Sequence, residues 1–325
     1  MNSARACWFL ASLLLGAAPL QGAYLFKNGH FINKNDVATK SAEEHFQSGL
    51  DSLKAKQWQE ARQQFHIVIV SFGQSSLAQD AQYYMAVALY EMDDFDVANR
   101  EFSTYLKKVN DASRLEDVYR YKLAIAERLS EGARTHLLGF DSLPKLQTDR
   151  SMALGIFEEV ASALPNHDLA ATALLKEAQQ LKAGERFHEA IEVYHTAIRR
   201  FPGSAFALQA FQGVSSCHVD EVRRQPQNVD AITLAEINLR QAVKDFPQAQ
   251  ELSFIEADLT SIKEMYVAAL YETGQLYERM SQPKASVLYY HLAEKAYPAS
   301  PVADLCRARK KELSQYADEL RLPSV

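Results

Sequence analysis

The stretch EAIEVYHTAIRRFPGSAFA, residues 189–207, decides how this chain folds. Ala190, Tyr194, Ala197 and Pro202 stand at offsets 0, 4, 7 and 12 from the first of them. The first three share one face of a helix, because a turn takes about 3.6 residues. Proline then cannot continue the helix and forces a turn. The stretch predicts a helix whose small residues let a second helix approach closely before the chain turns.

The same offsets recur five more times along the chain. The further sets are Ala61, Phe65, Val68 and Gly73; Ala98, Phe102, Tyr105 and Asn110; Ala153, Phe157, Val160 and Pro165; Ala235, Leu239, Ala242 and Pro247; and Ser286, Tyr290, Ala293 and Pro298. Their first residues are 37, 55, 37, 45 and 51 positions apart, which a base unit near 37 residues with insertions explains. Any all-helical protein can show alanines at helical spacing, but six matches favour a repeat. The predicted fold is all-α, a tetratricopeptide-like helix-turn-helix solenoid of about six repeats.

A second small residue is expected on the preceding helix of each unit, twelve positions before the first. Gly49, Ala86, Ala178 and Gly274 fit this expectation in four of the six units. The third and fifth units do not fit, because extra residues intervene.

The amino-acid composition is typical of a folded helical protein, and the net charge disfavours one class of partner. Hydrophobic residues make up 47% of the 325 residues, whereas glycine and proline number only 12 and 10, which disfavours an all-β fold rich in turns. The formal net charge of −6 gives no bulk attraction to nucleic acid, so no nucleic-acid partner is expected.

The N-terminus has the pattern of an export signal. Residues 1–23 contain one arginine, a short apolar run and small residues, as a cleaved signal peptide does; a retained signal anchor is the alternative. Cys7 precedes the apolar run, so no lipid-attachment cysteine is predicted. Cleavage would leave Cys217 and Cys306, for which two buried thiols are favoured over a disulfide. The mature protein is therefore expected to be exported to the periplasm, with residues 24–40 as an N-terminal extension.

The chain is predicted to divide into two functional parts followed by a tail. Repeats 1–4 span 41–210 and would bind substrate, repeats 5–6 span 211–315 and would dock a partner, and 316–325 form the tail. Two insertions, RTHLLGFDSLPKLQTDRSMA at 134–153 and VDEVRRQPQNVDAI at 219–232, are predicted to break the helices and replace short turns with loops.

No pattern of catalytic residues is found in the sequence. The motifs HExxH, GxGxxG, GxxxxGK[ST] and GxSxG are all missing. His188 and His195 lie seven residues apart and could share a helix face, but are predicted to be solvated rather than to bind a metal. We therefore expect no enzymatic activity, no cofactor and no metal.

A groove for an extended peptide is predicted along the first helix of each early repeat. The residues expected to face it are Phe46, Leu50, Leu53, Tyr83, Val87, Tyr90, Tyr121, Ile125 and Arg128. Tyrosine offers apolar area and one hydrogen bond at low entropic cost, and arginine can hold a carboxylate. The alternative is that the tyrosines pack between helices. Phe140 and Asp141 are predicted to lie on a projecting loop that contacts a partner.

Two stretches resemble the BamD family of outer-membrane assembly lipoproteins. The first is AEEHFQSGLDSLKAKQWQEARQQFHIVIVSFGQSSLAQDAQYYMAVALYEMDDFDVANREFSTYLKK, which is similar to that family's first two repeats. The second, DVYRYKLAIAERL followed by LLGFDSLPKLQTDRSMALGIFEEVASALPN, is similar to its third repeat. The resemblance covers most of residues 40–210. Two departures are the missing lipid-attachment cysteine and a chain longer than that family's usual length.

The resemblance implies a non-enzymatic scaffold at the periplasmic face of the outer membrane. Its expected partners are a BamA-like β-barrel insertase and unfolded outer-membrane proteins, and protein contacts would hold it at the membrane. An exported tetratricopeptide adaptor of the CpoB kind, which coordinates peptidoglycan and envelope processes, is the alternative, although residues 24–41 show no coiled-coil heptads. A chaperone for secreted effectors would be cytosolic, which the signal peptide disfavours.

Overall fold

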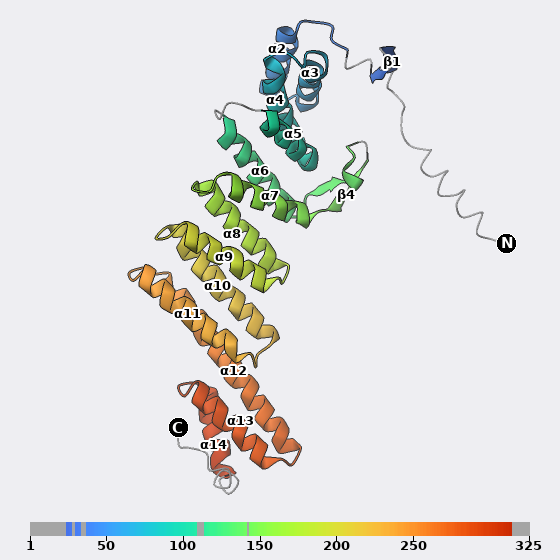
Figure 1. Ribbon diagram of the computed structural model, residues 1–325. Helices are drawn as coiled ribbons and strands as arrows, with labels where there is room; N and C mark the ends of the chain where they lie inside the picture. The colour runs from blue at the N-terminus through green and yellow to red at the C-terminus, as the bar shows by residue number, and fades with distance from the viewer. Residues whose placement is uncertain (1–23, 28–29, 34–36, 109–113, 142, 314–325) are drawn as a thin grey trace, which may run out of the picture. The chain divides into compact units, whose positions relative to one another are not determined.

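A computed structural model describes residues 24–27, 30–33, 37–108, 114–141 and 143–313 (Figure 1). Within these residues the chain is helical apart from two small antiparallel strand pairs. The predicted signal peptide at 1–23 and tail at 316–325 lie outside the described residues. None of the described helices is both long enough and apolar enough to cross a membrane.

The helices follow one another as six pairs and a final single helix. The pairs are α2 (Ala42–Lys54) with α3 (Trp58–Ser71), α4 (Leu77–Glu91) with α5 (Phe95–Lys108), α6 (Leu115–Ser130) with α7 (Arg150–Ala163), α8 (Asp168–Ala183) with α9 (Phe187–Arg200), α10 (Ala205–Arg224) with α11 (Val229–Asp245), and α12 (Leu252–Arg279) with α13 (Pro283–Ala296), followed by α14 (Pro301–Glu312). From α2 to α5, and again from α7 to α14, each helix packs against the next one in the chain. The predicted all-α fold of helix-turn-helix repeats is confirmed.

The described residues form two compact units. The first holds α2 to α5, the start of α6 and residues 134–148, and the second holds 126–133 and everything from 149 onward. The boundary therefore falls inside the third repeat. The predicted functional division near residue 210 stays a prediction.

Four of the six repeats turn from first to second helix in the same way. Lys56, Asp93, Glu185 and Ser281 each stand two residues after the first helix ends, with φ between 56° and 63°. This left-handed conformation stops a helix and redirects the chain. A shared backbone turn at equivalent positions is independent support for the repeat, which the side-chain pattern alone had indicated.

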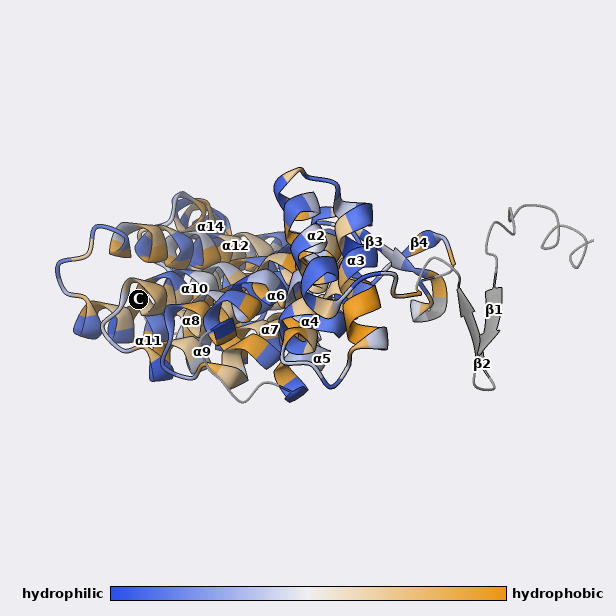
Figure 2. Cartoon of the chain, turned by 90° about the horizontal axis from the view of Figure 1, so that it is seen from above, coloured by the Kyte–Doolittle hydropathy of each residue, from blue (hydrophilic) through white to orange (hydrophobic). Residues whose placement is uncertain are grey.

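The first and last repeats bury a large side chain against the glycine twelve positions before their first small residue, as the offsets predicted. A Cβ built on Gly49 would lie 2.7 Å from Cε1 of Phe65, and one built on Gly274 would lie 2.5 Å from Cε1 of Tyr290. Both rings are fully buried. The helices carry apolar residues toward these contacts and polar residues elsewhere, so both colours appear around the helices in Figure 2. Glycine is thus needed at these positions because no space remains for a side chain.

The first insertion folds differently from a plain loop. It forms β3 (Arg134–His136), a short 3-10 helix η3 (Leu137–Gly139) and β4 (Lys145–Thr148), with the two strands antiparallel. We call residues 134–148 the arm. The remaining inserted residues begin α7.

The second insertion was wrongly predicted to break the helices. Residues 219–224 continue α10 and 229–232 begin α11, so only 225–228 form a turn. The reason is burial: Val219, Val222 and Ala231 pack with Ile262 of α12 in one apolar cluster. The inserted residues lengthen both helices by extending their buried faces.

The N-terminal extension contains a strand pair, β1 (Tyr24–Lys27) and β2 (His30–Asn33), with Tyr24 opposite Asn33.

Candidate functional site

A continuous cluster of aromatic rings runs through the first unit. Nine rings take part, with neighbouring centroids 5.2 to 6.5 Å apart: Phe46, Phe65, Tyr83, Tyr84, Tyr90, Phe95, Phe102, Tyr105 and Tyr121. Most contacts are edge-to-face, and the Phe65–Tyr84 and Phe102–Tyr121 pairs are stacked. Such pairs stabilise by about 0.5–1.5 kcal/mol each beyond area burial. The cluster therefore joins α2 to α6 through side chains of five successive helices.

The predicted groove residues fall into two groups within this cluster. Tyr83 is buried among four other rings, and burial raises its pKa to about 12. Ile125 is also buried. The partly exposed residues are Phe46, Leu50, Leu53, Val87, Tyr90 and Tyr121. The accessible part of the predicted groove therefore consists of these edges, with Tyr90 and Tyr121 only 5.2 Å apart.

The cation at this cluster is Arg114. Its guanidinium lies 5.1 Å from the ring centre of Tyr83 and 5.2 Å from that of Tyr84, and it pairs with Asp80. Arg128, which was predicted for this role, belongs to the second unit and pairs there with Glu131 at 3.4 Å. Sequence reasoning missed Arg114 because it precedes α6, outside the helical spacing used to select groove residues.

The arm is fixed to the start of α5 by ionic contacts. His136 lies buried against Asp96: its backbone N–H donates to Oδ2 and its Nδ1 lies 3.0 Å from Oδ1. Lys145 pairs with Asp94 and donates to the carbonyl of Asp93 at 2.9 Å. These contacts give the acidic residues Asp94 and Asp96 a structural role in holding the arm.

The tip of the arm exposes apolar side chains. Phe140 is 59% exposed, and Leu146 on β4 is exposed as well. Arg100 of α5 holds the base of the tip by donating to the carbonyl of Gly139 at 3.2 Å, and lies 3.9 Å from the carboxylate of Asp141. Phe140 and Asp141 therefore lie where a projecting element was predicted, although their role as a contact surface is not tested by this geometry.

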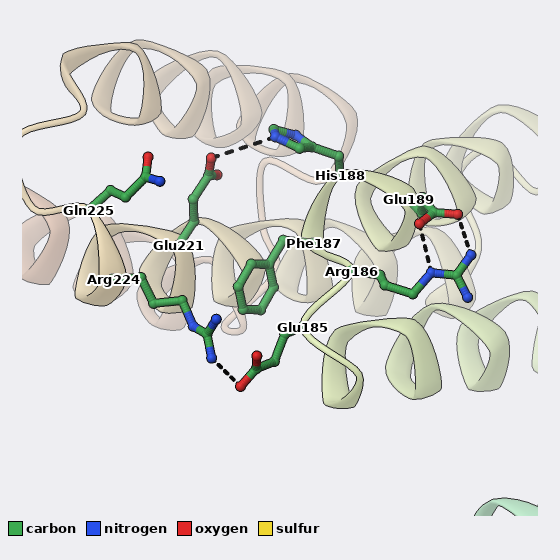
Figure 3. Close-up of a pocket in the computed structure, with 8 residues that line it drawn as sticks. All are labelled: Glu185, Arg186, Phe187, His188, Glu189, Glu221, Arg224 and Gln225. Carbon is green, nitrogen blue, oxygen red and sulfur yellow. Dashed lines mark hydrogen bonds and ion pairs between the residues drawn. The ribbon is translucent and has the colours of Figure 1, made fainter. Parts of the chain in front are cut away.

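A small pocket of about 310 Å³ lies in the second unit between the start of α9 and the end of α10 (Figure 3). The charged side chains around the pocket are paired with one another: Arg224 pairs with Glu185, and Arg186 donates to Glu189. Arg224 also lies over the ring of Phe187, with 5.7 Å between guanidinium and ring centre. A site whose ions are already paired offers little to a charged substrate.

The described residues hold no group of three or more His, Cys, Asp and Glu that could bind a metal. Cys217 and Cys306 are free and buried, and burial raises their pKa values to about 12 and about 11. His195 is half-buried, and burial lowers its pKa, so it is less solvated than predicted. Neither thiol is activated for nucleophilic chemistry.

Comparison with solved structures finds weakly similar proteins, including two that are described as tetratricopeptide repeat proteins. A repeat protein from Bacteroides fragilis is 13% identical, with 87% of this chain and 99% of that chain covered and a TM-score of 0.41. MamA from Desulfovibrio magneticus is 16% identical, with 66% and 99% covered and a TM-score of 0.36. A tetratricopeptide protein from Parabacteroides merdae is 11% identical, with 82% and 98% covered and a TM-score of 0.34. Comparison with curated protein sequences gave no match.

Comparison with protein-family models identifies the family of the chain. The model named YfiO, described as outer membrane lipoprotein, matches residues 38–215, which is more than half of the chain. The match covers the aromatic cluster, the arm and the first four repeats, and it confirms the BamD-like resemblance seen in the sequence. The chain therefore belongs to the YfiO family of outer membrane lipoproteins.

Proposed function

We propose that the protein is a non-enzymatic periplasmic scaffold in the assembly of outer-membrane β-barrel proteins. Membership of an outer membrane lipoprotein family, matched over residues 38–215, is the observation that carries this proposal. A BamA-like insertase and unfolded outer-membrane proteins are the proposed partners. The last two repeats, residues 211–315, would dock the insertase, and the protein would reach the outer membrane through these contacts.

The first unit has the surface to bind an unfolded barrel strand. Strands of membrane barrels alternate apolar and polar side chains. The partly exposed rings of Tyr90 and Tyr121 and the exposed tip residue Phe140 offer apolar contacts for alternate side chains. Both surfaces are supported, the rings by the aromatic cluster and the arm by the contact of His136 with Asp96 and the ion pair of Lys145 with Asp94. A supported surface loses little conformational entropy on binding.

Peptide binding tests the role of the arm. The probe is a fluorescein-labelled twelve-residue peptide in which aromatic or aliphatic residues alternate with polar ones, compared with a peptide of the same composition whose apolar residues are consecutive. Phe140→Asp should weaken binding of the alternating peptide at least about tenfold, as loss of an aromatic anchor does. Val70→Asp is the matched control, because Val70 is 56% exposed in the same unit on α3.

Two outcomes would contradict this role for the arm. One is equal binding of both peptides, and the other is an equal effect of the two substitutions.

Purification from envelope extract tests the wider assignment. The tagged protein should co-purify with a β-barrel insertase of the outer membrane, identified by mass spectrometry. Recovery of peptidoglycan synthases or division proteins without any β-barrel protein would instead support the exported-adaptor function and overturn this one.

A further inference from the structure

The second unit contains an apolar groove that the proposed function does not use. The groove lies between α9 and α11, which both pack against α10, and has a volume of about 490 Å³. Its apolar lining consists of Ile191, Ile198, Phe211, Val214, Leu234 and Ile237. Leu234 and Ile237 are 49% and 52% exposed although they stand one turn apart on the same helix. Neighbouring exposed aliphatic side chains beside a cavity are typical of a surface that another chain covers.

Two buried polar atoms in the groove lack hydrogen-bond partners among the described residues. Asn238 is 4% exposed; its Nδ2 donates to the carbonyl of Phe211 at 3.0 Å, and its Oδ1 has no partner. His218 is 3% exposed, and its Nδ1 has no hydrogen bond, the nearest carboxylate oxygen being that of Glu221 at 3.6 Å. An unsatisfied buried polar group costs about 1–3 kcal/mol, so these two atoms lower the stability of the groove wall.

The charged lining of the groove is acidic. Glu189, Glu192 and Glu221 line it, and no Lys or Arg stands among its described lining residues. Arg186 reaches Glu189 from outside the groove, and Glu221 lies 4.0 Å from Nε2 of His188 and 3.6 Å from Nδ1 of His218, so Glu192 is the lining carboxylate that stays available to a guest (Figure 3 shows Glu189, Glu221 and His188). Burial lowers the pKa values of His195 and His218, which favours their uncharged forms. The groove therefore presents hydrogen-bond acceptors and negative charge around an apolar centre.

The lining residues have helical spacing over about three turns. On α10 they are Phe211, Val214, His218 and Glu221, and on α9 they include Ile191, His195 and Ile198. At 1.5 Å rise per residue, each set extends over about 10–15 Å. An amphipathic helix presents anchors at the same i, i+3, i+7 spacing when it lies in such a groove.

We propose that the groove between α9, α10 and α11 binds a cationic amphipathic helix of a partner protein. Aliphatic side chains of the guest would cover Leu234 and Ile237, and a lysine or arginine residue beside them would meet Glu192. This site is independent of the role proposed for the first unit, because it is defined by different residues in a different unit.

Fluorescence anisotropy with designed helices tests the site. The probe is a fourteen-residue labelled peptide of leucine and lysine with leucines on one helical face, and the comparison peptide carries glutamate in place of every lysine. The purified protein should bind the lysine peptide at least about tenfold more tightly at low salt, and added salt should reduce the difference.

Two substitutions and one matched control locate the binding. Leu234→Asp should weaken the lysine peptide at least about tenfold, whereas Val243→Asp should change it by less than about twofold, since it places the same charge on another face of α11. Val243 is 41% exposed and does not line the groove, and all three substituted residues are solvent-accessible, so the variants should fold. Glu192→Lys should weaken the lysine peptide and strengthen the glutamate peptide.

The proposal is overturned if the two peptides bind equally, if Leu234→Asp and Val243→Asp have the same effect, or if Glu192→Lys leaves the preference unchanged. Circular dichroism of each variant confirms that the helices are intact before binding is compared.

Discussion

Gly274→Ala tests whether the repeat depends on a glycine packed against a ring. Gly274 lies within α12, and the three ring atoms of Tyr290 nearest to an added Cβ would be 2.5, 2.8 and 3.0 Å away. The ring cannot move aside easily, because it is fully buried, its hydroxyl donates to Glu278 at 2.5 Å, and Tyr271 lies 5.5 Å from it on another side. The new methyl group must therefore displace the ring or separate the helices.

Two opposing effects set the magnitude. Alanine is about 1 kcal/mol better than glycine inside a helix, which favours the variant. Overpacking a well-filled core costs about 1–3 kcal/mol, and loosening the hydrogen bond of Tyr290 costs about 1 kcal/mol more. The net expectation is a loss of about 1–3 kcal/mol in the free energy of unfolding, the sum of these terms.

Gly155→Ala is the matched control in the same unit. Gly155 lies within α7, and a Cβ there would have no atom within 4 Å, so only the propensity gain remains. This variant should be about 0.5–1 kcal/mol more stable than the wild type. Urea unfolding followed by circular dichroism at 222 nm measures both. If Gly274→Ala were as stabilising as Gly155→Ala, the ring of Tyr290 would not be packed on this helix, and the repeat packing described above would be wrong.

Three further predictions concern single side chains. Burial, with a smaller contribution from nearby negative charge, raises the pKa of Glu177 to about 7. The stability that its neutral form contributes is complete below pH 4.5 and is lost as pH rises through about 7. In urea titrations, the free energy of unfolding of Glu177→Gln should therefore exceed that of the wild type by about 1–2 kcal/mol at pH 8, after discounting for partial exposure, and equal it at pH 4. Phe102→Ala should lower the free energy of unfolding by about 3–4 kcal/mol because the ring is fully buried. Tyr90→Ala, at a partly exposed position, should lower it by about 1 kcal/mol. Equal losses would show that Tyr90 belongs to the core and not to a binding surface. Cys217 and Cys306 are buried and should react with a thiol reagent at pH 8 only after urea is added, and rapid labelling of the native protein would contradict their burial.

The repeat was predictable because it depends on side-chain size at fixed spacing. Ala61, Phe65 and their equivalents can be found in the sequence at a constant spacing. Because these residues are buried, the packing of the helices fixes that spacing. The shared left-handed turn at Lys56 and Asp93 was not visible, because lysine and aspartate are ordinary residues whose backbone conformation here is imposed by the helices on either side. A short stretch of sequence shows the size of each side chain, but it does not show which residues adopt a left-handed backbone conformation.

The candidate site was predicted less well, and the reason is physical. Helical spacing identifies which residues share a face but not whether a neighbouring helix covers that face. Tyr83 follows the groove pattern and is nevertheless enclosed by Phe102, Tyr105 and Tyr121. This error concerns long-range packing, which a short-range pattern does not contain.

Each proposed binding surface includes a residue from an insertion into the base unit of about 37 residues. In the regular repeats the large side chain packs against small residues, so most of its apolar surface is buried between helices. The arm at 134–148 is an addition that no neighbouring repeat encloses, which leaves Phe140 exposed. The extra turns of α10 and α11 similarly bring Glu221 to the groove and lengthen both of its walls. Substitution of Phe140 should therefore alter binding with little effect on folding, whereas substitutions at the repeated offsets should do the reverse.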